Sequence, residues 1–364
     1  MTNPTTALDI KIVSESYVQR AWSTFGCSKI PRVLCTDQGA GYNGTTTYKV
    51  GSIDNSLLAG LTNGGAMLDW LPGETAPVSR DLASTDVSFT CISKSTLAID
   101  RFLKRGATPA QRFRDLETNI VPILLSKCWQ DCDFQLAAAL INTNFWNTAK
   151  YFTVSSGKGM DSADDYSNQN PIADIQTNLD LLRPLKSMSG LSLEAILDGG
   201  VASVLARHPD FSGGGVASGV AGSLTRSVFA ERFKDILGLD DVHIIDSLGN
   251  TAALGQTASN KSIMGQSKAN SVLWFGLLDR RAGQFDLRSQ GSTDAPDGAI
   301  VLAEARLPEV VSARDDGREA ESFWGRASNV VYSPRGSSSG TVASNMGFFM
   351  AGQTSGTDGG VYAA

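Results

Sequence analysis

Charged residues, histidines and long apolar runs are all scarce in this sequence. Asp, Glu, Lys and Arg make up 19% of the 364 residues, below the ~25% typical of globular proteins. The net charge of −6 should weakly repel nucleic acid, which argues against a protein that reads DNA sequence. No apolar run reaches the ~18 residues of a membrane helix, and no secretory signal is visible. Five cysteines without framework spacing favour free thiols in a reducing compartment.

The shortage of histidine argues against nucleophilic catalysis. Residues 336–340 match the Gly-x-Ser-x-Gly nucleophile elbow. That arrangement requires a histidine later in the chain, but His208 and His243 both come earlier. We expect His208 to act at a helix end and His243 to be a surface or satisfied sheet residue. The elbow motif is therefore interpreted as a low-complexity loop.

Other candidate motifs are also incomplete. The glycine-rich stretch 213–222 lacks the Gly-Lys-Ser/Thr of a phosphate loop and follows a helix, so a surface loop is expected. Cys128 and Cys132 are spaced as ligands on one helical face but have no further ligands nearby, which favours structural thiols. Asp131 and Asp133 are expected to need only solvation. The sequence predicts no catalysis, no cofactor and no metal site.

The strongest positive signal is a long helix between Thr108 and about Trp146. Thr108, Pro109 and Gln111 form a capping box with proline at the first helical position. Unbroken, this spine helix would be about 58 Å long, and Pro122 should bend it. Its apolar face is predicted to contain Phe113, Leu116, Ile120, Ile123, Leu124, Cys128, Phe134 and Leu136.

The segments before the spine predict an arm and a long loop. In residues 1–44, a short helix is expected to begin at Ser14 and stop at Gly26. Residues 45–92 show two alternating strand patterns joined by an excursion with little apolar core of its own. Such an excursion should pack against another subunit.

The segments after the spine alternate helix and strand signals. Residues 170–285 predict a compact α/β unit, with helices opened by Pro171 and Thr225. From residue 299 the pattern predicts two strands joined at Asp316–Gly317, and then a Gly/Ser/Thr-rich tail with one strand near 346–350.

Three passages in this order resemble the major capsid proteins of tailed bacteriophages, the Hong Kong 97-type capsid fold family. The first is PGETAPVSRDLASTDVSFTCISKSTLAID, at 72–100, and the second is the spine helix. The third contains LEAILD, VLARHPD, FAERFKDILGLDDVHIIDS and NTAALGQTASNKSIMGQSKANSVLWFGLLD. Together they span about residues 70–285.

The resemblance implies an α+β fold with an N-terminal arm, an extended loop, a peripheral domain containing the spine, and an axial domain. The corresponding division is 1–44 for the arm, 45–92 for the loop, 93–165 for the peripheral domain, 166–295 for the axial domain, and 296–364 for peripheral strands and the C-terminal tail.

The resemblance also implies a function in assembly rather than catalysis. Subunits would form hexamers and pentamers of an icosahedral shell around double-stranded DNA, in the virion and, during assembly, in the bacterial cytoplasm. A separate scaffolding protein, a portal and a possible decoration protein are the implied partners. Residues 51–93 contain no lysine, so the loop should be stabilised without a Lys–Asn cross-link. A cellular shell enclosing an enzyme, and a soluble α/β enzyme built on 170–285, are the alternatives.

Opposite charges suggest which segments meet between subunits. Residues 51–90 contain five acids and one base, whereas 101–114 contain five bases and no acid. We expect the loop to lie across a neighbour's basic segment. A glycine-rich loop is also expected at the tip of the axial domain, facing its symmetry mates. The predicted interface residues are Asp69, Trp70, Leu71, Glu74, Arg101, Lys104, Arg105, Gly213, Gly214 and Gly215.

Overall fold

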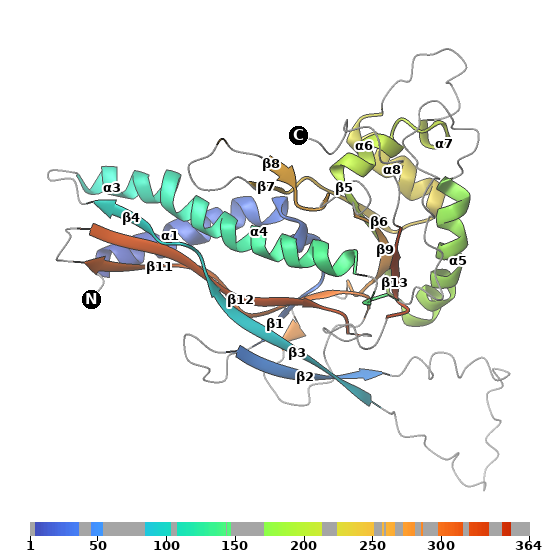
Figure 1. Ribbon diagram of the computed structural model, residues 1–364, viewed down its shortest axis with the longest axis horizontal. Coiled ribbons are helices and arrows are strands. Elements are labelled where there is room, and N and C mark those ends of the chain that lie inside the picture. The colour runs from blue at the N-terminus through green and yellow to red at the C-terminus, as the bar shows by residue number, and fades with distance from the viewer. Residues whose placement is uncertain are drawn as a thin grey trace, which may run out of the picture.

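Two sheets and a long helix organise the chain (Figure 1). The computed structural model describes residues 4–35, 45–53, 84–102, 108–142, 144–146, 171–212, 224–250, 257, 260–265, 272–280, 285–286, 298–315, 320–334 and 344–350. The spine runs along one face of a large sheet, and a smaller sheet with its own helices lies beyond the C-terminal end of the spine. The predicted α+β class is confirmed.

The large sheet has seven strands in the order β10-β1-β11-β12-β3-β2, and β4 also pairs with β12. The hairpin predicted at Asp316–Gly317 is confirmed in its two antiparallel arms, although the turn itself lies outside the described residues. The strands are β1 Arg32–Leu34, β2 Thr45–Ile53, β3 Ser84–Ser95, β4 Ile99–Phe102, β10 Phe285–Asp286, β11 Val301–Asp315 and β12 Ala320–Tyr332.

The spine begins at its predicted cap. Thr108 N–H donates to Gln111 Oε1 at 3.0 Å, and Gln111 N–H donates to Thr108 Oγ1 at 3.3 Å. The helix consists of α3 (Pro109–Asp115), a π-helical turn (Leu116–Ile120) and α4 (Val121–Leu140). Pro122 was expected to bend the helix. The structure places the π-helical turn directly before it, and this wide turn leaves more room for the proline ring than a regular α-turn.

The spine is shorter than predicted. It ends at Leu140, not at Trp146. The indole Nε1–H of Trp146 donates to the carbonyls of Ala139 (3.2 Å) and Leu140 (3.0 Å). Because the last carbonyls of a helix lack intrahelical partners, this bond satisfies the helix end and turns the chain away.

The predicted apolar face of the spine is correct except at two positions. Ile123 is 46% exposed and Phe134 is 44% exposed, so these two side chains lie on the outer side of the helix. The inner side approaches β12 closely at Gly325. A Cβ there would lie 2.9 Å from Cys128 Sγ and 3.1 Å from the Leu124 carbonyl oxygen. The missing side chain thus lets the helix rest on the strand.

Helix α1 (Pro4–Ala21) packs against the spine and β11. It begins ten residues earlier than predicted, so Ser14 lies inside the helix and not at its N-cap. Its inward side chains Ile10 and Val13 are buried, and this tertiary contact extends the helix beyond the local capping signal. None of the described helices combines the length and apolarity that crossing a membrane requires.

The small sheet has the order β13-β9-β5-β6, with β5 and β6 parallel. Its helices begin at the predicted Pro171 and at the N-cap Thr225, but the helix expected to run to Pro209 ends at Leu205. The elements are α5 Pro171–Ser189, β5 Ser192–Asp198, α6 Gly199–Leu205, α7 Pro209–Ser212, α8 Arg226–Leu237, β6 Asp241–Ile245, β9 Leu273–Leu278 and β13 Gly347–Phe349.

Two strands cross the boundaries drawn from the sequence. β10 lies at the end of the predicted 170–285 unit, within the predicted axial domain 166–295, but joins the large sheet. β13, from the tail segment, completes the small sheet. A pair of short strands, β7 (Leu248–Asn250) and β8 (Asn260–Ser262), forms a separate two-stranded ladder. Phe134 of the spine lies 3.1 Å from where a Cβ on Gly249 would be, so this ladder lies against the spine.

Candidate functional site: a turn clamped between the spine and the small sheet

A short 3-10 turn from the N-terminal segment joins the spine to the small sheet. The turn spans Gly26–Lys29 and contacts α4. A Cβ on Gly26 would lie 2.8 Å from Met264 Cε and 2.9 Å from Ile245 Cδ1. Glycine therefore allows the turn to lie directly on the face of the small sheet that carries Ile245.

Aromatic side chains before the turn surround one tryptophan of the spine. Trp129 is 1% exposed. The ring centroids of Phe25, Tyr17 and Trp22 lie 4.9, 5.7 and 5.7 Å from it, within the range of favourable aromatic pairs. This cluster fixes the position of the N-terminal segment on the spine.

A buried carboxylate on the spine holds the start of the turn. Asp133 is fully buried, and its Oδ1 accepts from Cys27 N–H at 2.7 Å. Its Oδ2 accepts from Ser247 Oγ, just after β6. Burial raises the pKa of Asp133, and these hydrogen bonds oppose the shift. The expectation that Asp133 needs only solvation was wrong, since its partners lie in segments distant along the chain.

A guanidinium holds the other end of the turn. Arg280 follows β9, and its Nη2 donates to the carbonyl oxygen of Lys29. A carboxylate thus meets N–H groups at the start of the turn, and a cation meets a carbonyl at its end. Both match the partial charges at the ends of a helical turn. We call Asp133 and Arg280, with the turn between them, the clamp.

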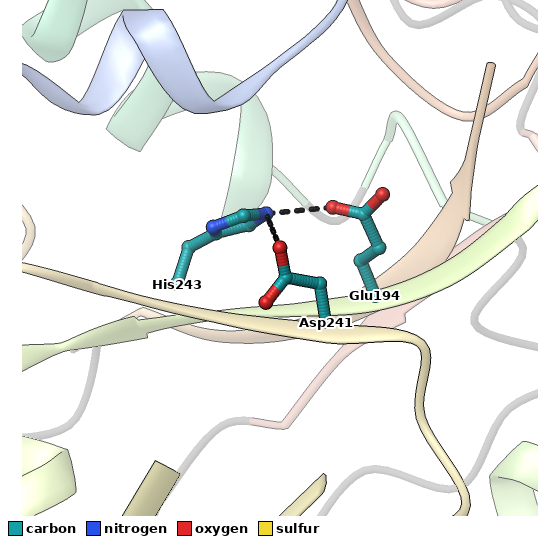
Figure 2. Close-up of side chains that lie close together, drawn as sticks. All are labelled: Glu194, Asp241 and His243. Atoms are coloured by element: carbon teal, nitrogen blue, oxygen red, sulfur yellow. Dashed lines mark hydrogen bonds and ion pairs between the residues drawn. The ribbon is translucent and has the colours of Figure 1, made fainter. Parts of the chain in front are cut away.

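Arg280 is itself fixed by a buried glutamate of β5. Its Nε donates to Glu194 Oε1, and its Nη2 donates to Glu194 Oε2, both at 2.7 Å. His243 Nε2 lies 2.6 Å from the same Oε2 and 3.8 Å from Asp241 Oδ2 (Figure 2). Burial acts to raise the pKa of Glu194, but the bonds from Arg280 and His243 outweigh it and lower the pKa to about 2.

Glu194, Asp241 and His243 offer three potential metal ligands within 4.8 Å of one another. Arg280 competes for this place. Its guanidinium occupies both oxygens of Glu194 and lies 3.2 Å from His243 Nε2. A cation that met all three side chains would have to displace a bidentate ion pair of a kind that is strong in proteins. The group is therefore an ion-pair node, and His243 is a satisfied sheet residue, as predicted.

The predicted interface residues are placed only in part. Arg101 lies in β4, where its backbone is the ladder partner of Glu321 in β12. The remaining nine lie outside the described residues: Asp69, Trp70, Leu71, Glu74, Lys104, Arg105, Gly213, Gly214 and Gly215. The thiols of Cys128 and Cys132 are buried and free, as predicted, and burial raises the pKa of Cys128 to about 12.

The contacts of the clamp were missed in the sequence, although Asp133 and the glutamate that holds Arg280 carry a signal. Glu194 interrupts the apolar residues of β5, and Asp133 lies between Cys132 and Phe134 of the spine. A charged residue inside a buried element is normally paired. Such interruptions mark candidates for buried polar contacts, but they do not identify the partner.

The fold has relatives among solved structures. A phage-related protein from Bordetella bronchiseptica RB50 is 13% identical, with a TM-score of 0.58 over 94% of this chain and 96% of its own. A virus-like particle from Pyrococcus furiosus is 6% identical, covering 94% of this chain and 98% of its own, with a TM-score of 0.46. The mature capsid of bacteriophage PhiM1 is 12% identical, covering 88% and 84%, with a TM-score of 0.39. No family model and no curated protein sequence matches the chain.

The first of these likenesses extends over nearly the whole of both chains and shows a shared fold. The order of elements agrees with it. An N-terminal segment is followed by the β2–β3 hairpin, the spine, a small α/β sheet and two long returning strands. The chain has the Hong Kong 97-type capsid fold that the sequence resemblance predicts.

Proposed function

We propose that this chain is a major capsid protein, a shell subunit that assembles into hexamers and pentamers around double-stranded DNA. The proposal assigns it no reaction and no cofactor. Its partners are other copies of itself, a separate scaffolding protein, a portal and a possible decoration protein. It acts in the virion, after assembly in the bacterial cytoplasm.

One feature of the fold carries the proposal. β2 pairs with β3 from Thr45↔Ile92 to Ile53↔Ser84, whereas β12 reaches β3 only at Ile92–Ser95. Residues 84–91 therefore form a two-stranded ribbon with no third strand among the described residues. Such a ribbon is marginally stable in water by itself. A neighbouring subunit that packs against it supplies the missing surface.

The ribbon offers a sharp test of assembly. Ile53 and Ser84 face each other in the ladder, so a two-residue Asn-Gly turn can replace residues 54–83 and close the hairpin. We expect this variant to fold with an unchanged circular dichroism spectrum and to remain unassembled. Loss of folding would show that residues 54–83 belong to the core of their own subunit.

Sedimentation velocity and negative-stain microscopy of the unaltered chain test the proposal itself. Capsomers and closed particles are expected. Particles from infected or expressing cells that protect DNA from nuclease support the viral function, whereas particles that enclose an enzyme support the cellular shell. A compact monomer at all concentrations contradicts both and favours a soluble α/β protein.

A further inference from the structure

We infer that the clamp is a latch: the turn Gly26–Lys29, held by Asp133 and Arg280, fixes the small sheet relative to the spine and thereby sets the curvature of the shell. This inference rests on the proposed function and adds the residues that control the shape of the subunit.

The latch contacts three separate parts of the chain. Asp133 belongs to the spine, Ser247 follows β6 of the small sheet, and Cys27 belongs to the N-terminal segment. One buried carboxylate on the spine therefore bonds to the other two parts. Because a buried acceptor that loses its donors is destabilising, Asp133 favours the arrangement in which all three parts meet.

Arg280, the second residue that holds the turn, acts in a similar way at its other end. Arg280 lies beyond β9, Glu194 lies on β5, and both are joined to Lys29 through the guanidinium. The two anchors are chemically opposite and come from different elements. A relative movement of spine and small sheet must therefore break at least one of them or pull the turn out of its place.

The seated turn also buries a thiol that can report on its movement. Cys27 is fully buried, and burial, with Cys132 and Asp133 of the spine beside it, raises the pKa of its thiol. Cys91 is equally buried, but it belongs to a different cluster with Val33 and Tyr332 on the large sheet. Opening of the latch should expose Cys27 and leave Cys91 covered.

The experiment compares full-length variants by the rate of N-ethylmaleimide labelling, mapped by peptide mass spectrometry, and by particle diameter in electron microscopy. For Asp133→Ala we expect Cys27 labelling at least tenfold faster with Cys91 unchanged, and particles of altered or heterogeneous diameter. Asp133→Asn can still accept from Cys27 N–H and bond to Ser247, so it should restore slow labelling. Asp131→Ala is the matched control, because Asp131 lies on the same helix as Asp133 and forms an exposed ion pair with Lys94 of β3.

Each possible result supports or overturns a stated part of the proposal. Unchanged Cys27 labelling in folded Asp133→Ala overturns the latch, and faster labelling with unchanged particle diameter overturns its control of curvature. If Asp133→Ala does not fold, Ser247→Ala and Arg280→Ala replace it, because each removes one contact that holds the turn or its partner. The rate of Cys27 labelling and the particle diameter are then measured for these two variants. If the unaltered chain forms neither capsomers nor particles, the proposed function and the curvature role are both overturned, whereas Cys27 labelling still shows whether Asp133 holds the turn.

Discussion

Buried carboxylates in this protein differ in how their charge is balanced. Glu194 meets a guanidinium through both oxygens and has a pKa of about 2. Asp133 and Asp198 accept mainly from backbone N–H and serine hydroxyl groups, and burial raises the pKa of both. Burial also raises the pKa of Glu304, although Arg32 opposes this shift. Of these four carboxylates, Glu194 is the one whose pKa is lowered, and it therefore stays ionised at moderately acidic pH.

The stability contributed by Glu194 should depend on pH in a defined window. Because its folded pKa lies below the ordinary value of 4.5, the stabilisation is complete above about pH 4.5 and is lost as pH falls toward 2. A shift of this size corresponds to roughly 3 kcal/mol. Arg280→Ala should lower the free energy of unfolding by that order at pH 7 and by much less near pH 2.5, as measured by urea unfolding.

The control for this prediction is Arg226→Ala, which removes the exposed ion pair with Asp246. Exposed pairs contribute little, so its effect on unfolding should be small at both pH values. A loss in Arg280→Ala that is equal at pH 7 and pH 2.5 would mean that the guanidinium acts by packing and not by charge.

Among the elements, those with local signals were predicted best. The capping box at Thr108 and the helix between Thr225 and the left-handed Gly238 were confirmed, because capping involves residues three or four positions apart. The strands β5, β6 and β9 were also confirmed, since each is a short apolar run between turn signals.

The elements that depend on distant partners were not predicted. β1 is a short strand that pairs with both β10 and β11, and β10 is a short strand that pairs with β1. No local pattern marks either of them. The early start of α1 depends on its packing against the spine. The clamp was missed for the same reason, because Cys27 and Asp133 are 106 residues apart.

The capping box should stabilise the first turn of the spine measurably. Thr108→Ala removes the side-chain acceptor for Gln111 N–H and should cost about 1 kcal/mol. Faster hydrogen exchange at residues 110–115 is the expected measurement. Thr118→Ala is the matched control, because Thr118 Oγ1 only donates back to the Arg114 carbonyl, and its removal should leave exchange in this turn unchanged.

At the scale of the whole molecule, charge distribution predicts how subunits meet. The acidic loop 51–90 is proposed to lie on a neighbour's basic segment 101–114. Complementary charge steers association more than it strengthens it. Arg101→Glu with Arg105→Glu should therefore block capsomer formation, and adding Asp69→Lys and Glu74→Lys should partly restore it, as followed by light scattering.

The dependence of assembly on ionic strength tests the same contact between subunits. Assembly of the unaltered chain should slow as ionic strength rises above ~0.1 M, where the Debye length falls below ~10 Å. The variant that carries all four charge reversals should show the same dependence on ionic strength. If the Arg101 and Arg105 reversals leave assembly and its salt dependence unchanged, this contact between subunits does not exist.

The position of β1 between β10 and β11 has a consequence for biosynthesis. Arg32 pairs with Leu302, about 270 residues later in the chain, and a ribosome adds about 5–20 residues per second. β1 therefore leaves the ribosome roughly 15–50 s before its partner on β11 has been translated. The turn Gly26–Lys29 waits almost as long for Arg280, and the small sheet, whose first strand β5 begins at Ser192, waits for β13, which begins at Gly347. A ribosome-bound chain thus cannot complete the large sheet until Tyr332 has been translated, or the small sheet until Phe349 has been translated.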